Sequence, residues 1–204
     1  RGPRSEDFEP AVLDLTANPL VLVSGSDESH LRQLFDSLAD LLSSRQDNEV
    51  IRLAPQDAEQ AVQSVANLLK DRRARQTEPG FDEKSWLSCL QQECLVIDGL
   101  PTVAGALTPA GQRTLRKILS KGGQFGLVAI ASAARDQLVG DEFDLVTDLA
   151  VNAGAAIVSG GAVGDYHFLH ISPDDPRGIA YLDDNESALV VDNRVTLFKR
   201  GGAL

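Results

Sequence analysis

Residues 20–25 have the sequence Leu-Val-Leu-Val-Ser-Gly, and residues 26–35 continue as Ser-Asp-Glu-Ser-His-Leu-Arg-Gln-Leu-Phe. The apolar run is continuous rather than alternating, which predicts a strand buried on both faces, as in a parallel sheet. From residue 31 onward, apolar residues recur at helical spacing, which predicts an amphipathic helix. A buried strand that ends in glycine and leads into a helix is typical of an α/β unit.

The same alternation of strands and helices continues along the chain. Further strands are predicted at residues 50–53, 94–98, 126–131 and 155–158, and helices at 58–69, 108–121 and 143–149. Near the C-terminus the pattern changes to short strands at 178–182, 188–191 and 195–198, with a turn at Asp192-Asn193. We therefore expect an α/β fold of three layers: a mainly parallel sheet, helices on both faces, and C-terminal antiparallel edge strands.

The chain of 204 residues is long enough for one domain with a sizeable core. We expect residues 1–10 to form a linker or tail and residues 11–204 to form a single domain, with a short edge strand at 11–15. Because the sequence contains no methionine, we also expect the chain to be a fragment of a larger multidomain protein. No apolar run approaches the roughly 18–20 residues that span a bilayer, so any membrane anchor is expected in the missing part.

The formal net charge is −11 and the isoelectric point is about 4.6. A surface of that sign repels phosphate backbones, so no nucleic-acid partner is expected. Two local basic stretches, residues 70–73 and 113–121, are interpreted as polar faces of helices. Cys89 and Cys94 lack a nearby histidine, which makes a poor zinc site, and we expect buried reduced thiols and no bound metal.

The junction of the first strand and helix is where phosphate-binding loops occur, because backbone N–H groups at a helix N-terminus form an anion site. Of the full pattern G-x-x-x-x-G-K-[ST], the sequence keeps only the first glycine, Gly25. His30 stands at the second glycine, Leu31 at the lysine and Arg32 at the hydroxyl residue. The candidate loop comprises Gly25, Ser26, Asp27, Glu28, Ser29, His30, Leu31 and Arg32.

These replacements have consequences for phosphate chemistry. Without the lysine, the phosphate charge has no fixed counter-ion, and without the hydroxyl, Mg²⁺ loses its loop ligand. Asp27 and Glu28 add negative charge to the place where phosphate would bind. We expect no efficient ATP hydrolysis and no cofactor in this domain. Three interpretations of the loop stay open: capping of the helix by Asp27 or Ser29, weak nucleotide binding, and hydrolysis by a non-standard loop.

A second motif is the segment 95–98, Leu-Val-Ile-Asp, which has the form of a Walker B strand. Asp98 is a candidate to hold Mg²⁺ through water, but a structural aspartate at a strand end fits the pattern equally well. Gly99 stands where many motor ATPases have the carboxylate that activates water. With both motifs altered, no catalytic residue is assigned.

Other candidate residues carry less specific signals. Arg113, Arg116 and above all Arg135 are candidates for an arginine that reaches a neighbouring subunit, although exposed arginines usually have no such role. His167 and His170 are interpreted as packing residues rather than as metal ligands.

In their order and spacing, these segments resemble the FtsK/SpoIIIE-like motor ATPases, most closely the last ATPase domain of the EssC/EccC motor of type VII secretion. The resemblance is carried by residues 18–25, 95–98, 123–131 and 176–182, and it extends over about residues 8–199. In the last of these segments, Ala180 replaces a glycine of the family's closing hairpin. The resemblance implies a RecA-like P-loop NTPase fold.

The resemblance also implies a parent protein that is anchored in the bacterial cell membrane and places this domain on the cytoplasmic side. The implied partners are the neighbouring ATPase domain of the same chain, in which ATP and Mg²⁺ are expected, and the small helical WXG100 proteins that the motor exports. The domain itself is expected to be degenerate and to act in substrate binding or regulation. Two alternatives stay open: an active ATPase domain with a non-standard loop, and a non-catalytic scaffold subunit like those of clamp loaders.

Overall fold

The computed structural model describes residues 8–44, 48–78, 80–82, 86, 92–138, 145–166, 168–169, 171–172 and 174–199. The strands are β1 (Leu20–Gly25), β2 (Asn48–Leu53), β3 (Gln92–Ile97), β4 (Leu127–Ala134), β5 (Ala155–Ala162), β6 (Tyr181–Val191) and β7 (Arg194–Lys199). The helices are α1 (Glu28–Ser43), α2 (Ala58–Gln76), α4 (Leu100–Ala106), α5 (Pro109–Lys121) and α6 (Leu145–Asn152). Short 3₁₀ helices are η2 (Gly122–Phe125), η3 (Arg135–Leu138), η4 (Val163–Asp165) and η5 (Pro176–Ile179).

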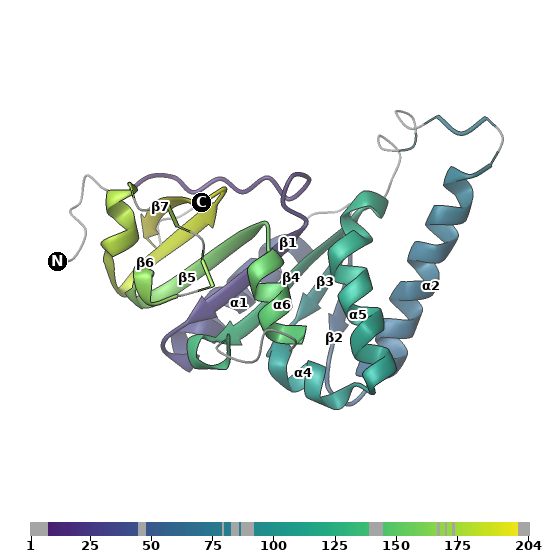
Figure 1. The fold of residues 1–204 in the computed structure, drawn as a ribbon, viewed down its shortest axis with the longest axis horizontal. Helices are drawn as coiled ribbons and strands as arrows, with labels where there is room; N and C mark the ends of the chain where they lie inside the picture. Colours follow the sequence, from purple (N-terminus) through teal and green to yellow (C-terminus); the bar gives the residue numbers. More distant parts are fainter. Residues whose placement is uncertain are drawn as a thin grey trace.

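The strands form one sheet in the order β2-β3-β4-β1-β5-β6-β7 (Figure 1). Strands β1 to β5 run parallel, whereas β6 pairs antiparallel with β5, and β7 pairs antiparallel with β6. The predicted fold is confirmed: a mainly parallel sheet that ends in antiparallel strands from the C-terminal part of the chain. None of the helices in the described part of the chain combines the length and the apolar character needed to cross a bilayer.

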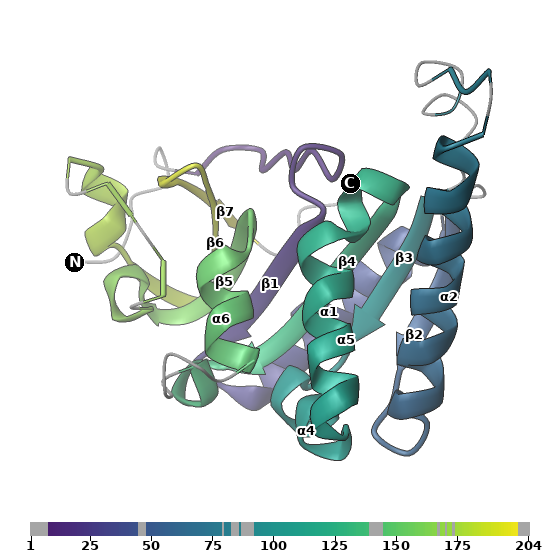
Figure 2. The ribbon, with the colours of Figure 1, turned by 45° about the vertical axis from the view of Figure 1, so that its right-hand side comes forward.

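Helices cover both faces of the sheet because side chains of the buried strands point alternately to either side. Leu20 and Leu22 of β1 join the core formed with α2, α4, α5 and α6, whereas Val21 and Val23 join the core formed with α1. Figures 1 and 2 show the larger group of helices on one side of the sheet and α1 on the other. Strand β1 is buried along its whole length and lies between β4 and β5.

The C-terminal strands differ in part from the sequence prediction. Asp192 and Asn193 have positive φ angles of 49° and 65°, which confirms the predicted turn between β6 and β7. The prediction of a separate strand at residues 178–182 is wrong, because Pro176–Ile179 forms η5 and Tyr181 begins the long strand β6. The pairing of β6 with β5 shifts register between Ser159 and Gly161, so β6 stays one strand across an irregularity.

Two further differences concern local elements. The expected strand at 11–15 is absent: these residues join no strand of the sheet. Leu13 and Leu15 pack against the core on the α1 side, and Phe8 forms an isolated bridge to Leu197 of β7. Helix α4 was not predicted from the sequence. Cys94 is buried in β3, whereas Cys89, His167 and His170 lie outside the described residues.

A buried ion pair joins the helix layer to the sheet. Arg72 of α2 lies with its Nη2 2.8 Å from Oε1 of Glu93 in β3, and its Nη1 donates to the carbonyl oxygen of Phe125 at 2.7 Å. Both charged side chains are less than a tenth exposed. Desolvation by burial raises the pKa of Glu93, and the positive charge of Arg72 opposes that shift. The pair therefore fixes the C-terminal half of α2 against β3 and η2.

We expect Arg72→Met to lower the free energy of unfolding by about 3–5 kcal/mol, because it leaves the buried Glu93 carboxylate without its counter-charge. The double substitution Arg72→Met with Glu93→Leu removes both charges and should cost much less. Urea denaturation checks both values. Arg73→Met, at the exposed neighbouring position, is the control and should change stability by less than about 0.5 kcal/mol. Equal effects of the two single substitutions would contradict a structural role for the pair.

Candidate functional site

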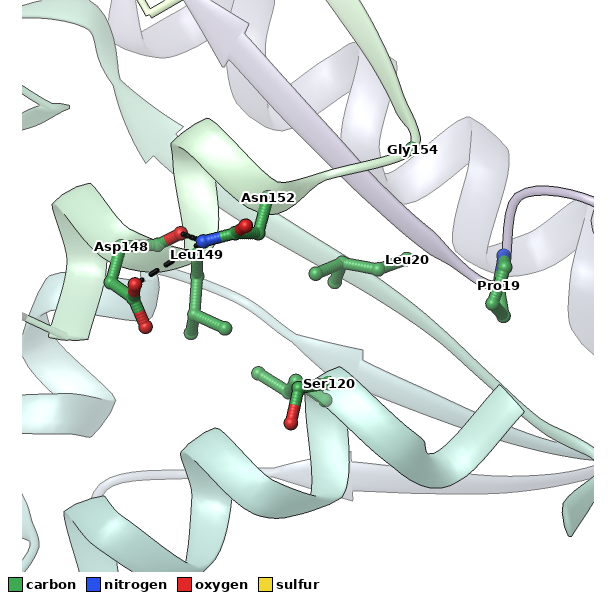
Figure 3. Close-up of a pocket in the computed structure, with 8 residues that line it drawn as sticks. Pro19, Leu20, Ser120, Asp148, Leu149, Asn152 and Gly154 are labelled. Carbon is green, nitrogen blue, oxygen red and sulfur yellow. Dashed lines mark hydrogen bonds between the residues drawn. The ribbon is translucent and has the colours of Figure 1, made fainter. Parts of the chain in front are cut away.

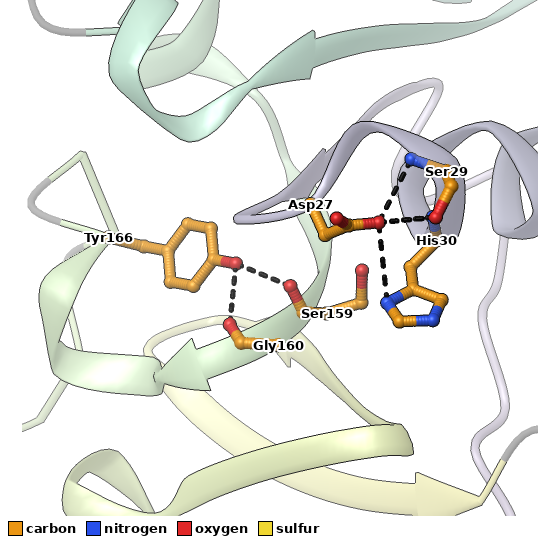
Figure 4. A network of polar contacts seen from close by, with 6 residues as sticks. All are labelled: Asp27, Ser29, His30, Ser159, Gly160 and Tyr166. Atoms are coloured by element: carbon orange, nitrogen blue, oxygen red, sulfur yellow. Dashed lines mark hydrogen bonds and ion pairs between the residues drawn. The ribbon is translucent and has the colours of Figure 1, made fainter.

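The carboxyl ends of the parallel strands bring together the polar residues that the sequence singles out. Gly25 ends β1, Asp98 follows β3, Arg135 follows β4, and Ser159 lies near the end of β5. In open parallel sheets, ligands bind at this edge, beside the N-termini of the following helices. Figure 4 shows the part of the edge at which α1 begins.

Only Ser26 and Asp27 separate the end of β1 from the first residue of α1. Asp27 is the N-cap: its Oδ1 accepts hydrogen bonds from the backbone N–H groups of Ser29 and His30, both at 3.0 Å, and from the hydroxyl of Ser29 (Figure 4). The predicted capping by Asp27 is confirmed. Two N–H groups of the first turn, which a bound anion would need, are thus already used by a carboxylate of the same chain.

The cap also fixes a negative charge at this position. The hydrogen bond from the Ser29 hydroxyl, followed by that from the His30 N–H, lowers the pKa of Asp27 below its ordinary value. The imidazole Nδ1 of His30 lies 3.5 Å from the same carboxylate oxygen. Asp27 therefore stays ionised at neutral pH, with its charge against the positive end of α1.

We expect Asp27→Ala to lower the thermal midpoint of unfolding at pH 7, because the first turn of α1 loses its acceptor. The contribution of Asp27 is fully present above its unfolded pKa of about 3.9 and is lost as the pH falls through the lower folded pKa. Scanning calorimetry of the wild type and the variant from pH 7 downward should show the two midpoints converging in acid. Glu28→Ala, at a side chain 86% exposed, is the matched control. A difference between Asp27→Ala and wild type that does not change with pH would contradict a charged cap.

The remaining residues of the candidate loop lie within α1 rather than in a loop. Leu31, at the position of the lysine in the P-loop pattern, is 7% exposed and packs into the core below the helix. Arg32 is exposed and lies 3.7 Å from Glu28 on the outer side of α1. The chain therefore presents neither a lysine nor a hydroxyl at the positions where the pattern has them, and its residues do not fit a Mg-nucleotide bound in that way.

Asp98 lies at the same edge of the sheet, directly after β3. Its carboxylate is exposed, and Oδ1 accepts a hydrogen bond of 3.0 Å from the Ser132 hydroxyl of β4. The Ser132 oxygen accepts in turn from the N–H of Gly99 at 2.8 Å. Gly99 has a φ of 71° and stands at the start of α4, so the backbone turns sharply after Asp98. In the described part of the chain, no group of three or more His, Cys, Asp or Glu residues is arranged to hold a metal ion.

Two of the three candidate arginines, Arg135 and Arg116, have ion-pair partners within the chain. Arg135 lies in η3 with its Nη1 3.2 Å from Oδ2 of Asp165, and its guanidinium lies over the ring of Tyr166 at 5.8 Å from the centroid. The Nε atom of Arg116 lies 3.0 Å from Oδ2 of Asp148 on α6. Arg113 is exposed on α5. A role of Arg135 toward a neighbouring subunit stays a prediction.

The contact of Tyr166 with β5 was not predicted from the sequence. Its side chain is buried, and the hydroxyl oxygen lies 2.7 Å from the carbonyl oxygen of Ser159 and 2.9 Å from that of Gly160 (Figure 4). Gly160 and the next residue, Gly161, have φ angles of 71° and 74°, which favour glycine. A Cβ at Gly160 would lie 2.6 Å from the hydroxyl oxygen of Ser26. The end of β5 is thus packed closely against the segment that leads into α1. The paired glycines are a sequence signal for such a contact, but they do not identify Tyr166 as its partner.

Burial raises the pKa of Tyr166 to about 12. We expect Tyr166→Phe to reduce the free energy of unfolding by about 0.5–1.5 kcal/mol, because the Ser159 and Gly160 carbonyls lose a donor. The difference should persist below pH 10 and vanish as the pH rises through the folded pKa, since only the protonated hydroxyl donates. Denaturant titrations at neutral and alkaline pH measure it. Tyr181→Phe, at a side chain 52% exposed, should have no comparable effect, and equal effects would rule out the proposed contact.

A cavity lies at the opposite, amino end of the strands. It has a volume of about 300 Å³ and opens between α5 and α6 beside the start of β1 (Figure 3). Leu20, Leu119 and Leu149 form apolar walls, and Ser120, Asp148 and Asn152 supply polar groups. The Nδ2 of Asn152 donates to both the carboxylate and the carbonyl oxygen of Asp148 (Figure 3). This cavity could not be predicted from the sequence, because its walls come from three separate segments.

No family model matches the sequence, and no curated protein matches it significantly. Solved structures do match the fold. The cytoplasmic domain of the type VII secretion ATPase EccC from Thermomonospora curvata superposes with a TM-score of 0.66 at 17% identity, over 94% of this chain and 25% of that chain. The chain has the fold of these ATPase domains.

The likeness extends to further ATPases. ATPases 2 and 3 of the same EccC, in complex with a signal sequence peptide, match with a TM-score of 0.62 at 16% identity, over 94% of this chain and 38% of that one. The cytoplasmic domain of EssC matches with a TM-score of 0.68 at 12% identity, over 97% and 43%. The genome packaging NTPase B204 of Sulfolobus turreted icosahedral virus 2, in complex with AMPPCP, matches with a TM-score of 0.53 at 13% identity, over 90% and 98%. The chain thus spans less than half the length of the EccC and EssC chains.

Proposed function

We propose that this chain is an ATPase-fold domain of a type VII protein secretion motor that acts through protein contacts rather than by efficient ATP hydrolysis. Its role is substrate binding or regulation of a neighbouring ATPase domain. The observation that supports this proposal is that the Asp27 carboxylate accepts hydrogen bonds from the backbone N–H groups of Ser29 and His30. In this proposal the domain is part of a longer, membrane-anchored protein and lies on the cytoplasmic side of the bacterial cell membrane. The likeness to EccC and EssC supports the assignment to this class of motor.

Nucleotide binding at the start of α1 is disfavoured by the Asp27 carboxylate and by the lack of a lysine. A phosphate would have to displace the Asp27 carboxylate from the first turn or lie directly beside it. Two negative charges in contact repel each other strongly. The position of the usual lysine would supply no compensation, because Leu31 is buried in the core. We therefore expect weak binding of Mg-ATP.

Isothermal titration calorimetry with Mg-ATP tests this part of the proposal. We expect no binding tighter than about 1 mM, which corresponds to about −4.1 kcal/mol. Asp27→Asn keeps an acceptor at the cap and removes the charge, so this variant should bind Mg-ATP more tightly than the wild type. Micromolar affinity of the wild-type chain would contradict the proposal and favour an active ATPase.

For substrate binding, we propose that the cavity between α5 and α6 receives an apolar side chain of a signal peptide from a WXG100-type protein. A signal sequence peptide bound to T. curvata EccC provides the precedent for this class of ligand. The volume of about 300 Å³ is at the lower end of the range of small-ligand pockets, and three leucine side chains line it. This cavity lies away from the start of α1, so peptide binding there would not require nucleotide.

Filling the cavity tests the peptide site. Ser120→Trp places an indole at its exposed rim and should weaken binding of a WXG100 signal peptide by at least about tenfold, or about 1.4 kcal/mol. Ser64→Trp is the matched control, because Ser64 is also exposed on a helix and its hydroxyl donates to a carbonyl of the preceding turn. Fluorescence anisotropy with a labelled peptide measures both. Equal affinities of the two variants would assign the peptide to another surface.

A second candidate function is an active ATPase with a non-standard loop. It is favoured by the exposed Asp98 carboxylate at the carboxyl end of β3, next to Ser132, and by the AMPPCP complex of the similar viral NTPase. In that case Asp98→Asn should abolish Mg²⁺-dependent ATP hydrolysis. Under the first proposal, the wild type and Asp98→Asn should be equally inactive.

A further inference from the structure

Two basic stretches that are separate in the sequence lie side by side in the fold. Helices α2 and α5 are neighbours on the same face of the sheet (Figures 1 and 2). Near their N-termini, the Glu59 carboxylate of α2 accepts from the N–H and the hydroxyl of Thr108, directly before α5. Near their C-terminal ends, Arg72 donates to the carbonyl oxygen of Phe125, just after α5. The two helices therefore run in the same direction, and their C-terminal halves lie next to each other.

The exposed basic side chains of the two helices lie on adjoining sides. On α5, Arg113, Lys117 and Lys121 follow one another at intervals of four residues, which places them along one side of the helix. On α2, Lys70 follows Glu59 by eleven residues, which is about three helical turns, so it lies on the side that faces α5. Arg73 lies one turn further on. We name these residues together the basic surface: Lys70, Arg73, Arg113, Lys117 and Lys121.

Within the described part of the chain, the positive charge of the basic surface is not neutralised by ion pairs. No ion pair joins any of its side chains to a described carboxylate. Helix α5 contains no acidic residue, and on α2 Glu59 is bound to Thr108 at the other end. Asp71 lies about 100° around α2 from Lys70.

The helix dipole does not account for the basic surface. Favourable interaction with the dipole is confined to the last turn, where Arg73 and Lys121 lie. Lys70, Arg113 and Lys117 lie before the last turns of their helices, where this effect is weak. The helix dipole therefore does not explain these three positive charges in a chain of net charge −11.

We propose that the basic surface binds an acidic segment of a partner protein. At physiological salt, charges are screened over about 8 Å, so a short segment that lies on the two helices interacts mainly with these five side chains. A duplex nucleic acid or an anionic bilayer would extend over the rest of the acidic chain and be repelled by it. Carboxylates spaced four residues apart on a helix match the spacing of Arg113, Lys117 and Lys121. This inference goes beyond the proposed secretion function and does not depend on nucleotide binding.

The test uses the whole chain and a fluorescein-labelled, glutamate-rich peptide of about 12 residues, which is about 18 Å long as a helix. Fluorescence anisotropy should show binding in about 50 mM salt that weakens markedly in about 300 mM salt. Lys117→Glu with Lys121→Glu should reduce the affinity by at least about tenfold. The control is Arg194→Glu with Lys199→Glu, which makes the same charge change at exposed positions of β7 and should leave the affinity nearly unchanged. Circular dichroism checks that both double variants fold.

Three outcomes would overturn the proposal. The first is equal loss of affinity in the two double variants, which would mean a response to net charge alone. The second is equal or tighter binding of a lysine-rich peptide of the same length. The third is salt-dependent self-association of the chain that Lys117→Glu with Lys121→Glu removes, as seen by sedimentation equilibrium, since it would assign the surface to a second copy.

Discussion

The close approach of β1, β5 and α1 at Gly25 determines how the edge of the sheet is built. A Cβ atom at Gly25 would lie 3.0 Å from the hydroxyl oxygen of Ser159 and 3.1 Å from the Cβ of Leu31. Contacts at these distances leave little room for a side chain, so glycine allows the helix to begin two residues after the strand. Leu31 can then turn into the core on the α1 side of the sheet, and α1 closes that face. The N-terminus of the helix is thereby held next to the end of β5.

The parts of the fold that depend on local sequence pattern could be predicted. Continuous apolar runs mark β1, β3 and β4 as buried strands, and the turn at Asp192-Asn193 marks the final hairpin. Helix α4 was not predicted because it is short and follows Gly99, whose N–H donates a hydrogen bond to the Ser132 hydroxyl of a distant strand. The continuity of β6 was not predicted because the polar residues at 183–186 look like a break. In the structure β5 pairs with β6 before this stretch, at 181–182, and again after it, at 187–191, whereas β7 pairs only with 186–191.

The candidate site was predictable only where its contacts are local. Capping by Asp27 spans three residues, and the sequence offered it as one of three interpretations of the loop, with Ser29 as the other candidate cap. The links from Ser132 to Asp98 and from Tyr166 to the end of β5 arise from strand order and backbone turns, which no spacing rule supplies. The same limit applies to the basic surface: each of its two stretches reads as a solvated helix face, and only the packing of α2 beside α5 places their charges together.

The two ends of the sheet differ in what they offer to a partner. At the carboxyl end, most of these polar groups interact within the chain. Asp27 accepts hydrogen bonds from the first turn of α1, the Tyr166 hydroxyl bonds to carbonyl oxygens of β5, and Arg135 forms an ion pair with Asp165. At the amino end lies the cavity, with Ser120 at its rim, and Lys121 of the basic surface is the next residue along α5. The buried strand β1 and the glycine at its end do not depend on the lysine and hydroxyl that phosphate chemistry uses. The strand and helix can therefore form without those side chains, and the cavity and the Lys121 end of the basic surface lie at the end of the sheet away from the start of α1.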